Sequence, residues 1–303
     1  MRVLISGSSG MIGSAASQLL FDDGHIISHL VRPQSKTPAA VGDVAWNPTT
    51  GELDLATAEG ADAVVHFAGA SIGDGRWTDE RKKLLRSSRV DATRGLVNSL
   101  SQLEAKPKTY VGASAIGYFG DRGEEKLTEH SGPGGDFLAQ ICRDWEREHI
   151  RAAEFGARVV ILRFGIVLST RGGAFPRMLT PIKCFVGGKL GTGNQWMSWI
   201  SLDDVAGIIR YVLENDAVRG PVNVVSPNPI RNADFIKTAA RAAHRPAMFP
   251  APAGALRFML GEMADSLLLS SQRVYAEKLQ SLRYAYQDKE LGATLSRLIA
   301  EKK

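Results

Sequence analysis

The chain has 303 residues, which is enough for one large domain or two modest ones. Its apolar fraction of 44% and charged fraction of 23% are typical of a soluble globular protein. The net charge is +5, but Lys and Arg are scattered among acidic residues and form no run of like charges. We therefore expect no nucleic-acid partner, since a small phosphorylated ligand explains the basic excess as well.

The two cysteines, Cys142 and Cys184, have neither CxxC nor metal-ligand spacing. The sequence thus predicts no disulfide framework and no metal site. The first residues, MRVLISGSSG, read as a strand that enters a glycine loop rather than as a signal peptide. No apolar stretch approaches the roughly 18 residues that a membrane span needs. We expect a cytoplasmic protein with no membrane partner.

Short apolar runs alternate with helical patterns through the first two thirds of the chain. Residues 11–24 have helical apolar spacing, with Gly24 as the expected stop. Near-continuous Val, Ile and Leu strands separated by helices predict an α/β fold, a Rossmann-type doubly wound parallel sheet covered on both faces. The predicted strands are residues 2–6, 25–31, 43–47, 63–69, 109–114 and 157–164.

The pattern changes after Phe164. Residues 170–198 are rich in Gly and Pro and predict an extended loop region. The next segment predicts a short strand and a helix capped near Asp203 or Asp204. One further strand is predicted at 221–227.

From Asn232 onward the chain is mainly helical in pattern, and RYAYQ near Tyr284 alternates like a strand. We expect two interleaved domains. The larger sheet domain comprises residues 1–169 plus 199–225, and a smaller, mostly helical domain comprises residues 170–198 plus 226–303.

Residues 7–13, GSSGMIG, have GxxGxxG spacing between the first predicted strand and helix. The first glycine makes a tight turn, the second admits a pyrophosphate, and the third lets the helix pack close to the sheet. The helix N-terminus adds unpaired N–H groups and a positive dipole for phosphates. The alternative is a tight turn without a ligand. The predicted dinucleotide-binding loop comprises Gly7, Ser9, Gly10, Met11, Ile12 and Gly13.

The choice of cofactor is set at the end of the second strand. NAD enzymes usually carry Asp or Glu there, about 20 residues after the glycines. Here Arg32 follows Gly13 by nineteen residues, whereas Asp22 and Asp23 come too early. A guanidinium pairs with a 2′-phosphate, which a carboxylate repels. We predict NADP, with NAD as the less favoured choice; the alternative is that Arg32 only faces solvent.

Seven segments over nearly the full length carry a resemblance to a known family. They are RVLISGSSGMIGS, VVHFAGASIGDGRWTDERKKLLRSSRVDATRGLV, SAIGYFG, GPGGDFLAQICRDWE, LRFGIVLSTRGGAFPRML, WISLDDVAGI and MLGEMADSLLLSSQRV. On these residues the chain resembles an extended short-chain dehydrogenase/reductase. More narrowly, it resembles the atypical "epimerase family protein" subgroup, which ends in a small C-terminal domain of unknown function.

This resemblance implies further cofactor contacts. Residues 67–69 would line the adenosine and ribose side, two residues of the following helical region would lie near the cofactor, and residues 166–167 would pack by the nicotinamide. For the apolar members, ordinary core packing explains the positions equally well. The implied contacts are Phe67, Ala68, Gly69, Leu84, Arg89, Ile166 and Val167.

In the wider superfamily a Ser or Thr, a Tyr and a Lys act together in general acid–base catalysis. Ser114 supplies the hydroxyl at the end of the fifth strand. Counting back from Glu146 in the pattern Tyr-x3-Lys-x3-Glu places Leu138 and Cys142 at the Tyr and Lys positions. Neither residue can replace them. Tyr118 remains the candidate proton donor, although the matching family element normally touches substrate.

Other polar residues fit structural positions better than catalytic ones. The polar loop 121–126 is expected at the surface, and His66 is expected to be packed or next to the cofactor. A nucleophilic Cys142 would need a lowered pKa and a nearby base, and His149 lies two turns away. Candidate residues for the far wall of a substrate pocket, or for a structural lining, are Arg177, Gln195, Trp196 and Trp199.

Two functions remain open. The first is an enzyme, an NADP-dependent oxidoreductase or nucleotide-sugar-epimerase-like protein that acts on a small carbonyl or sugar-like substrate. It would use Ser114, with Tyr118 as the candidate second catalytic residue. Alternatively, it holds NADP(H) as a sensing or structural ligand with little turnover. A role in protein interaction through the C-terminal helices is compatible with either.

Overall fold

A seven-stranded parallel sheet forms the centre of the chain in the computed structural model, which describes residues 1–33 and 41–301. The strand order is β11-β7-β5-β4-β1-β2-β3. The chain runs outward from β1 in one direction and then returns to build the other half from β4. This doubly wound Rossmann-type arrangement confirms the predicted fold class. The strands are β1 (Arg2–Ser6), β2 (Ile26–Val31), β3 (Val44–Ala45), β4 (Ala63–His66), β5 (Thr109–Ala115), β7 (Arg158–Phe164) and β11 (Gly220–Val224).

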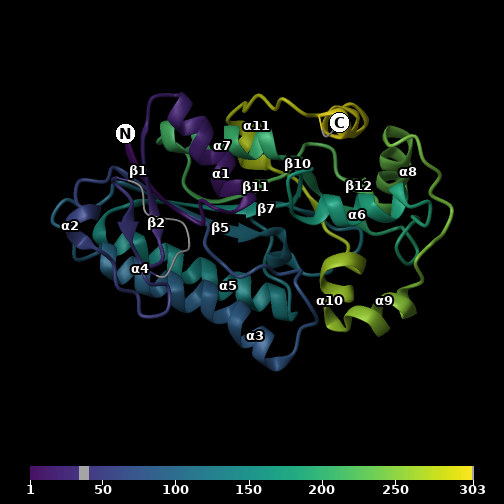
Figure 1. Ribbon diagram of the computed structural model, residues 1–303, viewed down its shortest axis with the longest axis horizontal. Coiled ribbons are helices and arrows are strands. Elements are labelled where there is room, and N and C mark those ends of the chain that lie inside the picture. Colours follow the sequence, from purple (N-terminus) through teal and green to yellow (C-terminus); the bar gives the residue numbers. More distant parts are fainter. Residues whose placement is uncertain (34–40, 302–303) are drawn as a thin grey trace.

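Helices cover both faces of this sheet, as its unbroken apolar strands require. Figure 1 shows α1 (Met11–Asp22), α7 (Leu202–Glu214) and α11 (Glu277–Ser281) on one face. On the other face lie α3 (Asp79–Arg86), α4 (Ala92–Leu100) and α5 (Phe137–Ile150). Gly24, with φ of +82°, follows α1 and ends it as predicted.

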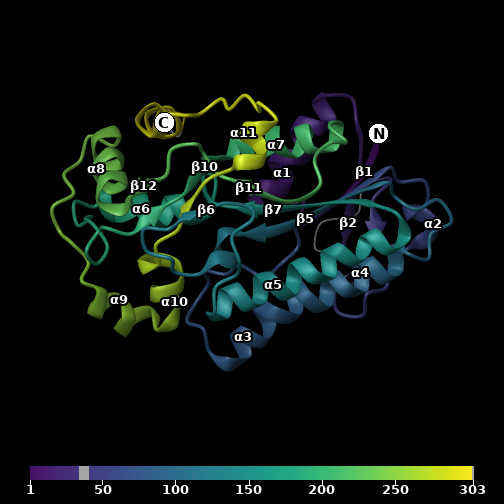
Figure 2. The same ribbon diagram turned by 180° about the vertical axis from the view of Figure 1, so that it is seen from behind.

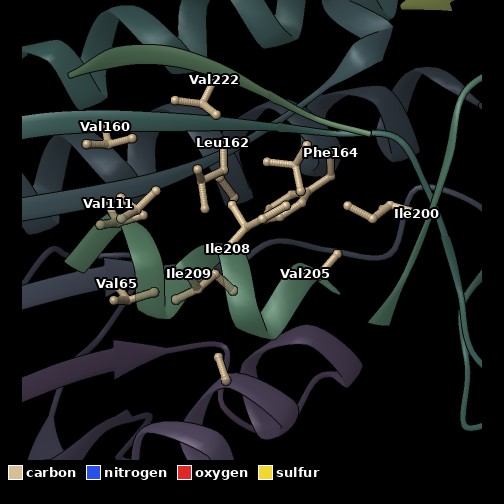
Figure 3. Packing of buried hydrophobic residues seen from close by; sticks show 14 of the residues in the cluster. Val65, Val111, Val160, Leu162, Phe164, Ile200, Val205, Ile208, Ile209 and Val222 are labelled. Carbon is tan, nitrogen blue, oxygen red and sulfur yellow. The ribbon is translucent and has the colours of Figure 1, made fainter. Parts of the chain in front are cut away.

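The main core lies between the sheet and α7. Figure 3 shows Val205, Ile208 and Ile209 of α7 directed at the strands, where Val111 and Leu162 lie. All five side chains are fully buried. Burial of each such side chain contributes about 1.5–3 kcal/mol, so this interface holds α7 firmly against the sheet.

The remaining elements are short and connect the sheet to the periphery. On the N-terminal side of β7 they are α2 (Leu55–Ala58), the π-helical turn η1 (Ser87–Asp91), η2 (Ile116–Phe119), β6 (Lys126–Leu127) and η3 (Arg151–Phe155). After β7 come β8 (Ile166–Leu168), α6 (Ala174–Lys183), β9 (Trp196–Met197), β10 (Trp199–Ser201), β12 (Ile230–Arg231), α8 (Asn232–Ala242), α9 (Ala253–Leu260), α10 (Glu262–Ala264), the π-helical turn η4 (Asp265–Leu269), β13 (Arg273–Val274) and α12 (Leu291–Ala300).

The prediction of an extended loop over 170–198 was wrong for residues 174–183, where α6 forms. Phe175, Leu179 and Ile182 share one buried face of this helix and pack in a core with Phe235 and Leu295. Burial of that face outweighs the internal Pro of the helix, because tertiary packing rather than propensity supplies most helical stability.

Two local predictions near α7 also need correction. The cap of α7 is Ser201, whose Oγ accepts a hydrogen bond from Asp204 N at 3.1 Å, rather than Asp203 or Asp204 themselves. RYAYQ forms no strand, because buried Asp204 accepts hydrogen bonds from Gln287 N and Asp288 N. The Asp204 carboxylate therefore accepts the backbone hydrogen bonds that a neighbouring strand would otherwise accept from this segment.

The C-terminal region joins two cores. Figure 2 shows α8 and α12 together at one end, and their buried residues pack with α6. Residues Val274, Leu279 and Tyr286, in contrast, belong to the core of the large sheet. The division into 1–169 plus 199–225 and 170–198 plus 226–303 remains a proposal. Among the described residues, no helix has both the length and the apolar character needed to cross a membrane.

Candidate functional site

The glycine loop after β1 is packed so tightly that two of its positions admit only glycine. Gly7 has φ of +69°, and a Cβ built on it would lie 2.8 Å from the Phe67 carbonyl carbon. A Cβ on Gly13 would lie 2.3 Å from the Gly7 carbonyl oxygen. Both distances are below any real contact, so side chains here would separate β1, β4 and α1.

The N-terminus of α1 faces this loop with free donor groups. Gly10 is the N-cap and makes no side-chain capping bond, while its own N–H donates to the Gly7 carbonyl at 2.9 Å. The first-turn N–H groups of α1 are thus left for a ligand, and the helix dipole favours an anion. Ser9 is exposed, and Met11 and Ile12 are half-buried.

A second segment of the chain lies over the start of α1. A Cβ built on Gly173, just before α6, would lie 3.1 Å from Met11 Cε and 3.9 Å from the Val167 carbonyl oxygen. Met11, Ile12 and Phe67 pack against the core cluster that contains Val167. Ile166 and Val167 form β8 beside β10. The structure therefore brings the loop, the end of β4 and β8 together, while their contacts with a cofactor stay a prediction.

Ser6 holds the backbone after β4 in place. Its Oγ accepts hydrogen bonds from Phe67 N at 3.1 Å and Ala68 N at 3.2 Å. The same oxygen lies 2.6 Å from His66 Nδ1. Since Ser6 already accepts from two N–H groups, its own proton is directed at Nδ1, which must be unprotonated.

His66 is therefore a neutral structural residue. Its Nε2 lies 3.0 Å from Thr93 Oγ1, to which it donates. Burial lowers the pKa of His66 to about 3, which agrees with the neutral form that the hydrogen bonds assign. The prediction of a packed histidine is confirmed.

His149 completes this buried network under the sheet. It lies 3.1 Å from the Tyr110 hydroxyl through Nδ1 and 3.0 Å from the Ala113 carbonyl through Nε2. Burial, with a smaller effect from His66, lowers the pKa of His149 well below its ordinary value. Both nitrogens of His149 are occupied, so it is not a base for Cys142.

Arg89 fixes the loop that follows Phe67. Its guanidinium donates to the Ala70 carbonyl at 2.9 Å and to the Leu85 carbonyl at 3.2 Å. It lies 5.2 Å from the Trp145 ring, and its Cζ lies 3.4 Å from where a Cβ on Gly69 would be. Burial lowers the pKa of Arg89. Arg89 sits on the π-helical turn η1, a type of turn common at functional sites.

Two other predicted cofactor residues lie near the surface. Arg32 directly follows β2, and because Ser6 pairs with Leu30 in register, Arg32 lies beside the glycine loop. Its side chain is exposed, and it forms no ion pair with the part of the chain that the structure describes. Leu84 is 47% exposed on α3, and its role stays a prediction.

Ser114 lies at the carboxyl end of β5, where ligands of doubly wound sheets bind. It is buried, and its Oγ donates to Glu146 Oε1 at 2.7 Å. Glu146 in turn forms a two-bond ion pair with Arg163, with both N–O distances 2.8 Å. Ser114 and Arg163 are register partners on β5 and β7. A carboxylate thus fixes the direction of the serine hydroxyl.

Tyr118 lies on the other side of Arg163. The guanidinium carbon is 3.6 Å from the centroid of the tyrosine ring, a close cation–π contact. Burial opposes the charge of Arg163, but hydrogen bonding and charge from Glu146, with a smaller contribution from Tyr118, raise the pKa of Arg163. Ser114, Glu146, Arg163 and Tyr118 therefore form one connected group.

The face of α5 next to this group has no usable proton donor. Leu138 Cβ lies 3.6 Å and Cys142 Sγ 4.0 Å from where a Cβ on Gly117 would be, so both positions face the Ser114–Tyr118 segment. Burial raises the pKa of the Cys142 thiol to about 12, the opposite of what a nucleophile needs. The described residues contain no group of three or more His, Cys, Asp or Glu placed to hold a metal ion.

The proposed wall residues have structural partners. Trp199 is fully buried and donates to the Asn228 carbonyl, and Gln195 donates to the Leu190 and Leu268 carbonyls. Trp196 lies between the guanidinium groups of Arg231 and Arg273 at 4.5 and 4.4 Å. These three fit the structural alternative.

The remaining wall residue and the polar loop connect distant segments. Arg177 binds Asp74 at 2.5 Å and so joins α6 to the loop after β4. The loop 121–126 is more than solvated surface, since Glu124 forms an ion pair with Arg231 at 2.9 Å.

Sequence reasoning missed Arg163, Ser6 and Thr93. Arg163 carried a readable signal, because a charged residue near the end of the apolar run ARVVILRF must be paired when that run is buried. Ser6 and Thr93 carried none, since their partner His66 becomes visible only when β1, β4 and α4 are placed together.

Comparison with known proteins agrees with this geometry. The profile of the NAD dependent epimerase/dehydratase family matches residues 3–225. The chain belongs to this family. A second profile, a domain of unknown function called DUF1731, matches residues 251–298 of this epimerase/dehydratase family member.

Individual relatives cover the whole chain. The epimerase family protein ML0860 of Mycobacterium leprae is 37% identical over 97% of this chain and 94% of its own length. YfhF of Bacillus subtilis, also named an epimerase family protein, is 37% identical over 100% of this chain and 99% of its own length. The structure of human epimerase family protein SDR39U1 with NADPH is 31% identical, has a TM-score of 0.89 and matches 99% of both chains.

Proposed function

We propose that this chain is an NADP(H)-binding enzyme of the epimerase/dehydratase family that acts on a carbonyl or sugar-like substrate through Ser114 and Tyr118. The observation that carries the proposal is the position of the Ser114 hydroxyl. It is held by the Glu146–Arg163 ion pair at the carboxyl end of β5, on the same edge of the parallel sheet as the glycine loop after β1.

Binding of the cofactor rests on the first half of the sheet. The closely packed Gly7 and Gly13 leave the N-terminus of α1 open to a pyrophosphate. Arg32 supplies an exposed guanidinium at the end of β2, where a 2′-phosphate would be recognised. The human relative carries NADPH, which supports NADP over NAD for this chain.

A relocated cation accompanies this cofactor site. The family pattern has a lysine where this chain has Cys142. The half-buried guanidinium of Arg89 acts on the Cys142 thiol and favours its ionised form, against the larger effect of burial. Arg89 is fixed by two backbone carbonyls, so its charge stays at this point. We assign to Arg89 the part that the lysine plays for the cofactor ribose.

The reacting oxygen of the substrate would be held by residues from the other half of the sheet, at the ends of β5 and β7. When bound beside these residues, NADP(H) would supply or accept the hydride. Ser114 donates a hydrogen bond to the substrate oxygen in place of Glu146, and Tyr118 exchanges the proton with that oxygen. Arg163, 3.6 Å from the Tyr118 ring, favours negative charge that develops on the phenol oxygen.

One observation favours a second candidate, a sensor that binds NADP(H) with little turnover. Leu138 and Cys142 are both buried, so α5 offers packing where the superfamily has its proton donor and its cation. In this second reading, the Ser114–Glu146–Arg163 group only stabilises the fold.

The two candidates are separated by a screen of NADPH oxidation against panels of carbonyl compounds and nucleotide sugars. On any substrate found, Ser114→Ala and Tyr118→Phe should each lower kcat by about 10²–10⁴-fold, while NADPH affinity stays within about twofold. Ser281→Ala, at an exposed position of α11, is the matched control. Unchanged turnover in both variants would remove this site from the mechanism, and tight NADPH binding without any substrate would favour the sensor.

A further inference from the structure

The net positive charge of the chain is concentrated in two segments, residues 170–198 and 229–261. Together these segments contain nine Lys or Arg but a single acidic residue, Asp234, whereas the whole chain carries only +5. The rest of the molecule is therefore acidic on balance. Figure 2 shows α8, the centre of this basic region, at the opposite end of the molecule from α2.

A groove runs along α8 within this basic region. One face of the helix forms part of its wall through Ala233, Ile236 and Ala240. Lys237 and Arg241, each the next residue in the sequence after Ile236 and Ala240, line the same face. The cavity is about 500 Å³ and is open to solvent on one side. Its remaining lining residues are Lys189, Arg245, Ala247, Met248 and Pro250.

The opposite wall of the groove is shaped before any ligand binds. His244 has φ of +52°, and Arg245 N donates to the Ala240 carbonyl, so the chain turns back at the end of α8. Phe249 N then donates to the Gly187 carbonyl at 3.1 Å, and Ala251 N donates to the Lys189 carbonyl at 2.9 Å. Pro250, in the wall itself, restricts the backbone further. Because the walls are already ordered, a ligand that binds there has a smaller entropic cost to overcome.

The cations around the groove are not neutralised. Lys189, Lys237, Arg241 and Arg245 form no ion pair with any carboxylate in residues 1–33 and 41–301. Other cations of the same region are paired, as Arg177 is with Asp74 and Arg231 with Glu124. Four free positive charges at one cavity repel one another, and an anion placed between them would relieve that repulsion.

Apolar side chains extend the groove beyond these cations. Phe185, just before Gly187, is 52% exposed, and Phe249, opposite Gly187, is 58% exposed. Met248 is 72% exposed. The Arg245 guanidinium lies 4.9 Å from the Phe185 ring. An occupant would thus meet positive charge and apolar surface side by side.

We propose that this groove binds a small amphipathic anion, with an apolar body on the alanine and methionine wall and a phosphate or carboxylate group among the four cations. A cavity of about 500 Å³ lies within the roughly 300–1,000 Å³ of small-molecule sites. A stable protein partner would need about 800 Å² of surface per side, and ten lining residues supply less than the roughly 20–30 of such an interface. The charge and the size together select a small ligand. The site does not depend on the proposed reaction at Ser114.

The test is isothermal titration of the full chain with octyl phosphate, n-octanol and inorganic phosphate. Octyl phosphate should bind at least about tenfold more tightly than either of the other two, since each of them offers only half of the chemistry. Lys237→Glu/Arg241→Glu should weaken octyl phosphate binding by about tenfold or more, because two attractions become repulsions. Ala247→Trp, which fills the groove without a change of charge, should weaken it as well.

The matched control is Arg147→Glu/Lys289→Glu, which makes the same change of charge at two exposed positions outside the groove, neither of which forms an ion pair within the described part of the chain. Its octyl phosphate affinity should stay within about twofold of the unmodified chain. Equal losses in both double variants overturn the site, and so does octyl phosphate binding that Ala247→Trp leaves intact. Binding of inorganic phosphate as tight as that of octyl phosphate, or binding only to vesicles of phosphatidylglycerol, also overturns it.

Discussion

The glycine-loop region and the α5 face meet at the same edge of the sheet but tolerate change very differently. At the loop, backbone atoms of β1, α1 and β4 touch directly, with Gly7 and Gly13 leaving no room for a Cβ. At α5, side chains fill the space, and the buried Leu138 and Cys142 stand where the superfamily pattern has its Tyr and Lys. Backbone contacts allow one residue type, whereas a packed side-chain face accepts any substitute of suitable volume.

Charge shows the same contrast between the two regions. Two cations near α5 come from other elements: Arg89, to which we assign the part of the missing lysine, lies on η1, and Arg163 lies on β7. Neither comes from the helix that carries the family motif. In the proposed function, chemistry beside α5 thus depends on residues from neighbouring elements, whereas cofactor binding depends on the glycine loop itself.

The largest effect is expected at Gly13. In Gly13→Ala the new Cβ would lie 2.3 Å from the Gly7 carbonyl oxygen, so the backbone of the loop must move. We expect NADPH affinity to fall by about 100-fold or more, together with a lower Tm. Gly254→Ala is the control, because a Cβ there meets nothing within 4 Å. Fluorescence titration and thermal melts measure both, and equal behaviour of the two variants would refute the steric argument.

A smaller but still large effect is expected from Glu146→Gln. This change leaves the buried Arg163 guanidinium without its counter-charge, and the free energy of unfolding should fall by about 3–5 kcal/mol. Glu148→Gln on the same helix should lower it by about 1 kcal/mol or less, because its partners Arg94 and Arg151 are partly exposed. Urea denaturation gives both values. A Glu146 variant no less stable than the Glu148 variant would show that the ion pair is not anchored as described.

The buried histidines predict a dependence of stability on pH. His66 is neutral in the folded chain, with a pKa of about 3, and its unfolded pKa is near 6.5. The unfolded state therefore binds an extra proton below pH 6.5, and stability present above that pH is lost as the pH falls toward 3. The slope is about 1.4 kcal/mol per pH unit for one histidine.

Urea denaturation between pH 7 and 5 measures this slope, with the carboxylates still ionised over most of that range. His66→Gln should flatten the slope by roughly one proton, while His244→Gln at an exposed position should leave it unchanged. An unchanged slope in His66→Gln would mean that His66 takes up its proton in the folded chain.

The sequence and the structure agree where local rules decide. The strands of the sheet and the glycine loop were predictable, because apolar runs and glycine spacing report backbone geometry directly. Ser114 was found from its place at the end of β5, but its partner Glu146 and the pairing with Arg163 depend on the register of β5 with β7. The helix α6 was missed because its apolar face is interrupted by prolines, and only contact with α8 and α12 explains it.

The most direct test of the account is the relative affinity of the unmodified chain for NADPH and NADH. We expect NADPH to bind at least about tenfold more tightly, because the exposed Arg32 beside the glycine loop would pair with the 2′-phosphate. Arg32→Glu should abolish or reverse that preference without lowering Tm, since the side chain is exposed. Equal affinity of the unmodified chain for the two cofactors, or no binding of either, would contradict it.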